Sequence, residues 1–581
     1  MLRKSLIAVV LAALLVFALA SAAAGSDRRS SQESASTSLL IPGVTYTREV
    51  DFTSRGPIVL DIVTAPKPTG TVYSLAPALS NGVLRGRETL THLEQRVAAG
   101  ATTVAVDADY FDRRTGAPDG ILMHNGVLAS VPAAGRTSLG IDASGTLTTA
   151  RVSFAGIWQG NGQRRPLVLN TPAGKGKFTL YTPAYGTSTP RESNVVEAVL
   201  GSLPAARLGT TLGGTVTRVT NSGPTQIPAG GAVLVAHGAQ STAELRAEAP
   251  AGQQVESMLS LSPDWRALPS AIGGGPRLVK DGKPVFHANE SFDAGRLNSR
   301  QPRGAIGQLA DGRILLVGVE GTNPAYSIGM SNYELAVELS RLGATTAYGL
   351  GSGSAAGIAF DGQLLTRPAA GSEAKISDAL IFSYAGVYAV PPSTPVLSPN
   401  GDRVGDFEKL SYRVVRPSDV VATLAGPGGT QITLANGSQS PGVHTFTWNG
   451  SDGGSPAPEG QWMFTVTATD DREVKTTAQR TFSLDETLSS LAVRTGRRPS
   501  ATFRLTRPAD VLVQIERRNG VAVATLLEGR RTAGPLHVTW KGRIGKRQAP
   551  RGRYKVVVEA TSSVGTSALE AVFAFRPRHR H

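Results

Sequence analysis

The C-terminal third of the chain repeats itself, and this repeat constrains the fold more than any other feature of the sequence. The segments SYRVVRPSDVVATL, HTFTWNG and APEGQWMFTVTATD recur in the same order as TFRLTRPADVLVQI, LHVTWKG and APRGRYKVVVEATS. Trp448 matches Trp540 and Gly460 matches Gly552, an offset of about 92 residues. Self-similarity at one spacing indicates two like structural units that follow each other along the chain.

Each unit has the pattern of a half-buried antiparallel sheet. Apolar and polar residues alternate over short stretches, such as FTVT from Phe464 and YKV from Tyr554, and turn signals such as PAPEGQ and QAPRGR separate them. A unit of about 90 residues with one buried Trp and several such strands predicts an Ig-like β-sandwich. We therefore expect two all-β Ig-like sandwiches, at residues 391–485 and 486–577.

Three motifs make these units similar to the Ig-like modules of flagellar hook-capping proteins: LSPNGDRVGD, TFTWNG and PEGQWMFTVTATD. The resemblance implies a spacer or attachment role and specifies no ligand. In the first motif, Asn400, Asp402 and Asp406 bring three oxygen-bearing side chains to close spacing, which suits a structural Ca²⁺ in the first unit. The alternative is a charged turn that only caps the first strand, since Ca²⁺ takes roughly six oxygens or more.

The N-terminus has the pattern of a signal peptide over residues 1–25. An apolar run of the right length follows the cations Arg3 and Lys4, and small residues then offer a cleavage site. The pattern predicts a secreted or cell-surface protein, with an uncleaved N-terminal anchor as the alternative. The Ser-rich segment that follows, residues 26–41, is expected to be a disordered leader.

Composition excludes several classes of site. The chain has no cysteine, which rules out disulfides, thiolate metal sites and a cysteine nucleophile. It also has no Walker A, HExxH or GxSxG motif, and we expect that it requires no cofactor. The formal net charge is +15, and basic residues crowd toward the C-terminus in RTGRRPS, KGRIGKRQAPRGRYK and RPRHRH. Because no pattern of interleaved aromatic residues accompanies these cations, the sequence does not indicate binding of nucleic acid. We therefore expect an anionic cell-envelope surface as partner, or simply a solvated basic surface.

The remaining region, residues 42–390, must carry any chemistry. Strand-like stretches such as GPIVLDIVTAP and TTVAVDADYFD alternate with two helical patterns, ETLTHLEQRVAAG and MSNYELAVELSRLG. In the second pattern Leu335, Leu339 and Leu342 form an apolar face, and Gly343 suits the C-terminal cap. This mixture predicts an α+β fold for the N-terminal domain.

Five motifs in this region resemble the phosphodiester glycosidase family: VDADYFD, PDGILMHNG, AIGGGPRLVKDG, RQPRGAIGQLADGRILLVGVEG and ELAVELSRLGATTAYGL. They occur in the family's order, with an apparent insertion between residues 150 and 260. The resemblance implies hydrolysis of a sugar 1-phosphodiester, with release of a sugar such as N-acetylglucosamine and of a phosphomonoester. In a bacterium the substrate would be a wall or capsule polymer that contains sugar phosphates.

Several residues in these motifs suit the binding of a phosphodiester. Guanidinium groups bind phosphate bidentately, and consecutive glycines let backbone N–H groups approach it without hindrance. Serine hydroxyls after the second helix can also bind phosphate oxygens. The candidate substrate-binding residues are Arg300, Gly273, Gly274, Gly275, Ser352 and Ser354.

Cleavage at an anomeric carbon also needs carboxylates, which protonate the leaving oxygen or activate water. Three acidic residues follow strands within the motifs, and an arginine can bind the phosphate beside them. The candidate catalytic residues are Asp107, Asp109, Glu320 and Arg303. Each also has a structural alternative, because arginines before strands form surface ion pairs, glycine runs form turns, and an Asp in such a turn caps N–H groups.

One loop departs from the family pattern. Where the family carries LDGGGSST, this chain has LGSGSAAG, so Gly351 replaces an Asp and Ala355 and Ala356 replace hydroxyl residues. The family's Asn in the first motif also falls on Asp107. The alternative function is therefore a catalytically impaired carbohydrate or wall-polymer binding protein, in which Gly351→Asp would recover some activity.

Overall fold

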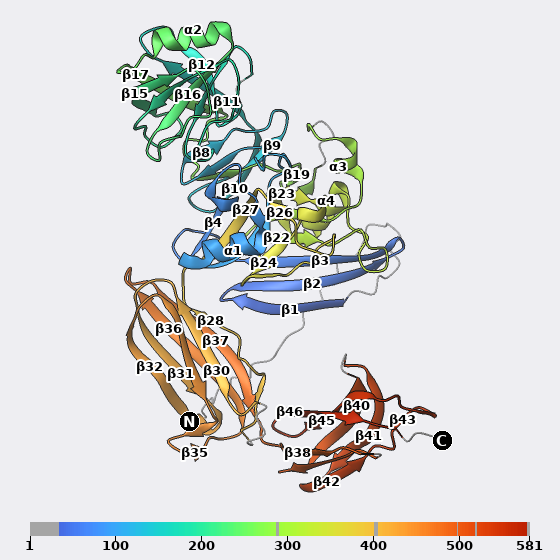
Figure 1. Ribbon diagram of the computed structural model, residues 1–581. Coiled ribbons are helices and arrows are strands. Elements are labelled where there is room, and N and C mark those ends of the chain that lie inside the picture. The colour runs from blue at the N-terminus through green and yellow to red at the C-terminus, as the bar shows by residue number, and fades with distance from the viewer. Residues whose placement is uncertain are drawn as a thin grey trace, which may run out of the picture.

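The computed structural model describes residues 34–172, 174–285, 290–399, 405–496, 498–517 and 520–577. Figure 1 shows a central pair of sheets, a barrel above it and two β-sandwiches below it. Within these residues no helix is long and apolar enough to cross a membrane. The segment expected to be a signal peptide lies outside the described residues, whereas the last 8 residues of the expected leader form strand β1 and pair with β2.

An eight-stranded sheet and a five-stranded sheet form the centre of the molecule. Apolar side chains from both, among them Val63, Val106, Ile306 and Phe382, fill the space between them. The larger sheet runs, in spatial order, β1 (Ser34–Ile41), β2 (Val44–Thr53), β3 (Gly56–Ala65), β22 (Ile314–Val319), β21 (Arg303–Leu309), β23 (Ala344–Ser352), β19 (Arg277–Lys280) and β20 (Lys283–Pro284). The smaller runs β25 (Gln363–Leu364), β24 (Ile358–Phe360), β6 (Thr102–Asp107), β27 (Asp378–Tyr384) and β4 (Tyr73–Leu79).

Both predicted helices are present, but they only flank the sheets. Helix α1 (Leu90–Val97) starts at the N-cap Thr89, and α4 (Asn332–Arg341) starts at a capping box formed by Ser331 and Glu334. Leu335 and Leu339 pack α4 against the outer face of the larger sheet. The remaining helices of the described chain are α2 (Ala239–Glu248) and α3 (Ala294–Asn298).

The predicted α+β class is therefore wrong. Strands make up 54% of the described residues and helices 8%, so the fold is almost all β. The two helical patterns were identified by their periodicity, but they are short. The apparent insertion, for which no strands were predicted, contains seven strands and one helix, α2, in its described residues.

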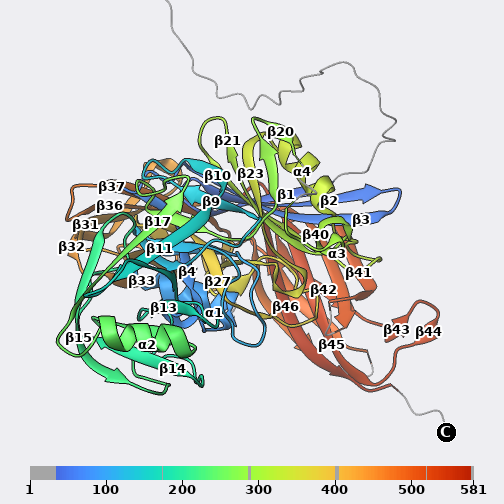
Figure 2. The same ribbon diagram turned by 90° about the horizontal axis from the view of Figure 1, so that it is seen from above.

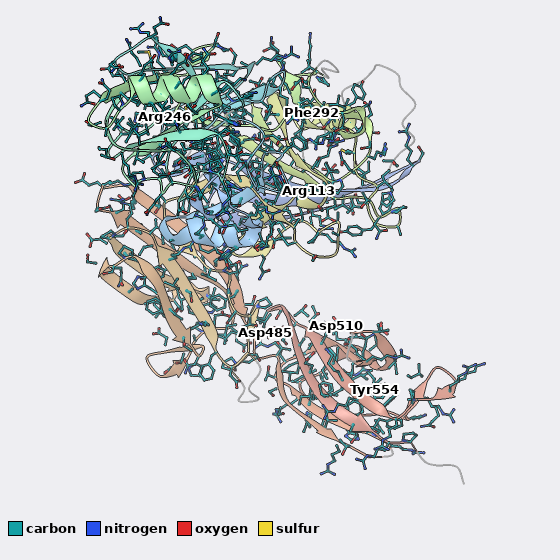
Figure 3. The ribbon with its side chains drawn as sticks, turned by 45° about the horizontal axis from the view of Figure 1, so that its top comes forward. Arg113, Arg246, Phe292, Asp485, Asp510 and Tyr554 are labelled. Atoms are coloured by element: carbon teal, nitrogen blue, oxygen red, sulfur yellow. The ribbon has the colours of Figure 1, made fainter. Side chains whose placement is uncertain are left out.

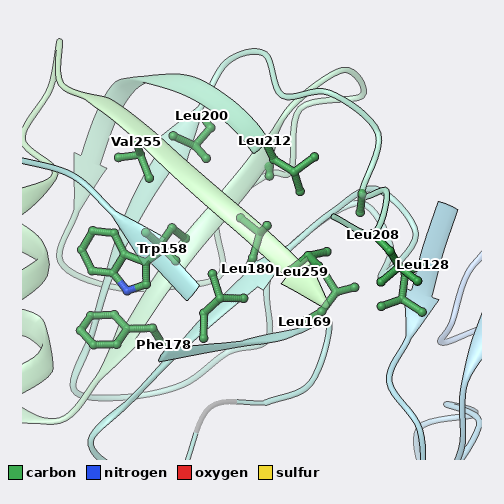
Figure 4. Packing of buried hydrophobic residues seen from close by; sticks show 14 of the residues in the cluster. Leu128, Trp158, Leu169, Phe178, Leu180, Leu200, Leu208, Leu212, Val255 and Leu259 are labelled. Atoms are coloured by element: carbon green, nitrogen blue, oxygen red, sulfur yellow. The ribbon is translucent and has the colours of Figure 1, made fainter. Parts of the chain in front are cut away.

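That insertion is a closed barrel next to the central sheets. Its strands are β11 (Ser153–Gln159), β12 (Arg165–Leu169), β13 (Lys177–Tyr181), β16 (Ala232–His237), β14 (Val195–Leu200), β15 (Thr211–Thr220) and β17 (Gln254–Ser262). Trp158 and Phe178, with ring centroids 5.0 Å apart, pack among leucines inside it (Figure 4). A five-stranded sheet joins it to the centre: β10 (Leu147–Arg151), β9 (Thr137–Ile141), β18 (Ser270–Ile272), β7 (Leu122–His124) and β8 (Val127–Ser130). A further short pair is β5 (Glu88–Thr89) with β26 (Lys375–Ile376).

The C-terminal third forms two β-sandwiches, each with its own apolar core. In the first, Trp448 packs on Trp462 at 4.6 Å, and in the second Trp540 packs on Tyr554 at 5.0 Å. The first contains β28 (Tyr388–Ala389), β30 (Glu408–Val414), β33 (Gly442–Trp448), β29 (Val396–Leu397), β37 (Lys475–Leu484), β36 (Gly460–Asp470), β31 (Ser418–Ala425) and β32 (Gln431–Gln439). The second contains β38 (Leu488–Arg494), β39 (Ser500–Leu505), β42 (Gly534–Thr539), β41 (Ala522–Arg531), β40 (Ala509–Arg517), β45 (Gly552–Thr561) and β46 (Thr566–Phe575).

The prediction of two β-sandwiches agrees with this architecture. Each sandwich also has a small hairpin after its central Trp, β34 (Ser451–Asp452) with β35 (Ser455–Pro456), and β43 (Arg543–Ile544) with β44 (Arg547–Gln548). Arg480 of the first sandwich donates to the carbonyls of Leu39 and Leu40 in β1 and so fastens the sandwich to the central sheets, and it also donates to Ala389 within the sandwich.

Candidate active site

Three buried carboxyl groups lie together where β6 ends and β27 begins. Asp107 is the last residue of β6, Asp109 follows two residues later, and Asp378 is the first residue of β27. The strands are antiparallel, with Asp107 opposite Ala379, so the end of one meets the start of the other. The three residues are 1%, 2% and 0% exposed. We call Asp107, Asp109 and Asp378 the carboxylate cluster.

Hydrogen bonds fix two of these groups and leave the third open. The backbone N–H of Asp109 donates to Asp378 Oδ1 (2.9 Å), while the N–H groups of Tyr110 and Gly120 donate to Asp109 Oδ1 and Oδ2 (2.7 Å each). Neither carboxylate oxygen of Asp107 has a partner in the described part of the chain, and neither has Asp378 Oδ2. Buried oxygens without partners are rare in folded proteins, so Asp107 is the member of the cluster with the most unused hydrogen-bonding capacity.

Burial sets the protonation of the carboxylate cluster. Removal from water raises the pKa of Asp107 and of Asp109 well above the ordinary value, and the charge of Asp378 raises both further. Burial likewise raises the pKa of Asp378, to about 7. At neutral pH the cluster therefore retains protons, which is the state that a general acid needs.

Glycines make room for these carboxyl groups. A Cβ atom on Gly351 would lie 1.8 Å from Asp107 Oδ2, and one on Gly273 would lie 2.1 Å from Asp109 Oδ2. Gly274 and Gly275 have φ values of +128° and +104°, which side-chain-bearing residues rarely adopt. The predicted glycine run thus lies beside the carboxylate cluster, where Gly273 leaves space for Asp109.

Arg303 fixes the loops beside the cluster. Its guanidinium is buried and donates to the carbonyl oxygens of Met330 (2.7 Å), Arg296 (2.9 Å) and Ser299 (2.8 Å). Burial lowers its pKa to about 10. These three bonds tie α3 and the segment before α4 to the start of β21, so Arg303 positions the site.

Tyr110 joins this arginine to the glycine loop. Its hydroxyl lies 3.5 Å from the carbonyl oxygen of Gly275. Burial raises the pKa of Tyr110, and Ser352, which pairs with Arg303 across β21 and β23, acts to lower it. The guanidinium of Arg296 lies 5.0 Å from the Tyr110 ring, and Phe292, labelled in Figure 3, packs against that ring at 5.5 Å. Arginine, tyrosine and serine groups thus border the carboxylate cluster.

Glu320 belongs to a different buried cluster. It lies 3.5 Å from Arg48 and accepts the N–H of Arg367 (2.8 Å), and its negative charge and hydrogen bond contribute to raising the pKa of Asp61 to about 8, although burial is the larger cause. No hydrogen bond or ion pair among the described residues connects Glu320 to Asp107. The structure therefore places this predicted catalytic residue apart from the other carboxylates.

The remaining predicted residues lie outside the cluster. Arg300 forms an ion pair with Glu334 in the capping box of α4 and donates to Gly329 O (3.2 Å), and Ser354 is exposed. Of the expected Ca²⁺ ligands, Asn400 and Asp402 lie outside the described residues. Across the described ranges, which include Asp406, no group of three or more His, Asp or Glu side chains is arranged to hold a metal ion.

Sequence analysis missed Asp378. The only local signal is an acidic residue directly before an apolar strand, DALIFSY, which also suits a simple strand start. Its role depends on the pairing of β27 with β6, and the two residues joined by the Asp109 to Asp378 hydrogen bond are 269 positions apart. No local pattern predicts such a pairing.

Comparison with known families agrees with the motifs. Residues 206–383 match the family model for phosphodiester glycosidases. That resemblance is confirmed. Residues 490–563 match the model for the FlgD Ig-like domain, which covers the second sandwich. The phosphodiester glycosidase match includes Asp378, Gly351 and Arg303 and begins after Asp107 and Asp109.

One solved structure has a related fold. A hypothetical protein from Synechocystis is similar at 27% identity and a TM-score of 0.50, over 59% of this chain and 62% of that one. This chain therefore spans less than two thirds of that relative. The catalytic domain of zebrafish N-acetylglucosamine-1-phosphodiester α-N-acetylglucosaminidase, auto-inhibited by its pro-peptide, is similar at 12% identity and a TM-score of 0.33, over 61% and 87% of the two chains. No curated protein matches the sequence.

Proposed function

We propose that this chain is an exported phosphodiester glycosidase that hydrolyses a sugar 1-phosphodiester in a wall or capsule type of glycan. The observation that carries the proposal is the carboxylate cluster, which lies beside a glycine loop in a chain that matches the phosphodiester glycosidase family. Clustered buried carboxyl groups with raised pKa values are typical of acid–base sites.

The chemistry follows from the state of these groups. Water forms a bond to the anomeric carbon as the bond from that carbon to the phosphate oxygen breaks, so a sugar and a phosphomonoester leave. A protonated carboxyl group can give its proton to the departing phosphate oxygen, and an ionised one can take a proton from water. Asp107 has free oxygens for the first task, and Asp378, with a pKa of about 7, can exchange protons near neutral pH.

Hydrolysis of an N-acetylglucosamine 1-phosphodiester by the purified chain tests the proposal directly. We expect sugar release that Asp107→Asn abolishes: the amide, which the family carries at this position, keeps the shape of the side chain but cannot transfer the proton, and Gly351 offers no carboxylate in its place. Glu94→Gln is the matched control, since Glu94 is also buried, has a raised pKa through burial, and lies in α1 outside the carboxylate cluster. Equal activity of wild type and Asp107→Asn would contradict the assignment.

The second candidate is a binding protein on the same scaffold. The observation that favours it is the loop at β23, where Gly351, Ala355 and Ala356 offer no carboxylate or hydroxyl group. It predicts saturable binding of a sugar-phosphate polymer without turnover. Absence of sugar release from several sugar phosphodiesters, together with such binding, would favour it over the glycosidase.

A further inference from the structure

The hairpin β43–β44 of the second sandwich carries a dense positive charge. Residues 541–553 contain six cations and no acidic residue. All six side chains are exposed, and Figure 2 shows the hairpin projecting outward from its sandwich. The cations are Lys541, Arg543, Lys546, Arg547, Arg551 and Arg553. We call residues 541–553 the cationic hairpin.

Neighbouring acids do not neutralise this charge. Within the described part of the chain, no ion pair includes any of the six cations. Among the acidic residues on the adjacent strands, Asp510 pairs with Arg530 at 3.2 Å, and Glu516 and Glu570 pair with Lys555 at 3.6 and 2.6 Å. Glu528 and Glu559 form no ion pair with the six cations within the described part of the chain. The positive potential of the cationic hairpin is therefore available to an outside anion.

The first sandwich holds the same hairpin by the same bonds. Trp448 Nε1 donates to the carbonyl of Ser451 (2.8 Å), and Trp540 Nε1 donates to the carbonyl of Arg543 (3.1 Å). Ala457 and Ala549 also donate equivalent backbone bonds, to Gly450 (2.8 Å) and Gly542 (2.9 Å). The backbone of the hairpin thus does not require cations.

The charge of the two hairpins is nevertheless opposite. Residues 449–461 of the first sandwich contain two acids, Asp452 and Glu459, and no Lys or Arg. Glu459 is used inside the molecule, where it pairs with Arg507 of the second sandwich. The two hairpins share their fold and their anchoring bonds, so neither feature accounts for the six cations, which only the second hairpin carries.

We propose that the cationic hairpin binds a linear anionic polymer with phosphates in its backbone, such as a phosphodiester-linked glycan or polyol. Four of the six cations are arginines, whose planar guanidinium groups bind phosphate oxygens bidentately. The aromatic rings next to the hairpin, Trp540 and Tyr554, are buried and cannot stack on nucleobases. Ile544 is its largest apolar residue and is only half-exposed, which is too little for insertion into a membrane. Because binding needs no cleavage, the inference stands apart from the proposed function.

The test measures binding of fluorescent poly(glycerol phosphate) to the full chain at several salt concentrations. In the hairpin variant, Lys541, Arg543, Lys546 and Arg547 are changed to Gln. In the control variant, Lys175, Lys177, Lys280 and Lys283 are changed to Gln, which removes the same charge from exposed positions in another part of the chain. A 20-base-pair DNA duplex and vesicles of phosphatidylglycerol with phosphatidylcholine serve as competing probes.

We expect the hairpin variant to raise the Kd for the polymer by about tenfold or more at 150 mM salt, with the control variant unchanged. The slope of log Kd against log salt should fall from roughly 4 for six contacts to roughly 1.4 for two. Equal weakening in both variants would overturn the proposal, because net charge alone would then explain binding. Tighter binding of wild type to DNA or to vesicles than to the polymer would also overturn it.

Discussion

Replacement of Gly351 tests whether Asp107 occupies the position on which the site depends. A Cβ on residue 351 would lie 1.8 Å from Asp107 Oδ2 and 2.6 Å from its Cγ, where ordinary contacts begin near 3.4 Å. The carboxyl group would have to move by about 1.6 Å inside a fully buried cluster. Gly351→Asp should therefore displace Asp107 and abolish sugar release, contrary to the gain of activity that the sequence alone suggested.

The expected loss of stability is modest. Overpacking of a buried site costs about 1 to 3 kcal/mol, and in a chain of this size that lowers Tm by only a few degrees. Thermal unfolding and sugar release are measured for Gly351→Ala and Gly351→Asp, with Gly213→Ala as control, because a Cβ on Gly213 meets nothing within 4 Å. Activity should fall much further than Tm.

A double variant tests whether positions 107 and 351 are coupled. Asp107→Gly combined with Gly351→Asp moves the carboxyl group from β6 to β23 while removing the clash. We expect the double variant to be more stable and more active than Gly351→Asp alone, a coupling that independent sites would not show. A Gly351→Asp protein that kept the wild-type Tm and released sugar faster than wild type would show that Asp107 is not displaced and that the site does not depend on its position.

Three further predictions follow from buried charges. The pKa of Asp378 is about 7 in the folded protein against an ordinary 3.8, so the stability that its protonation contributes is lost as pH rises from about 4 to 7. Asp378→Asn should remove up to roughly 4 kcal/mol of this pH dependence of the free energy of unfolding, measured by denaturant unfolding at pH 4 and pH 8. Arg303→Lys leaves carbonyls of the site loops unpaired and should cost about 3 kcal/mol together with most of the activity; an unchanged Tm would argue against a positioning role. Arg480→Ala removes two bonds to the central sheets and should produce a separate calorimetric transition for the first sandwich, whereas a single unchanged transition would contradict this.

Local signals in the sequence determined the local structure. The repeat around Trp448 and Trp540 specified two sandwiches, and the Ser331 cap located α4, because periodicity and capping act over a few residues. The same reasoning assigned too much weight to two helices and overlooked the strands of the barrel insertion, although β15 and β17 alternate between exposed and buried residues. The carboxyl groups of Asp107 and Asp109 could likewise be found from their motif.

Only the tertiary structure decided which candidates meet. Pairing of β6 with β27 brings in Asp378 from a distant part of the chain, while Glu320 joins Asp61 on the neighbouring strand β3. Gly351, which looks like a lost carboxylate in the sequence, is the space that Asp107 fills. These outcomes depend on strand register and on the volume between two sheets, and neither property is encoded in any short segment.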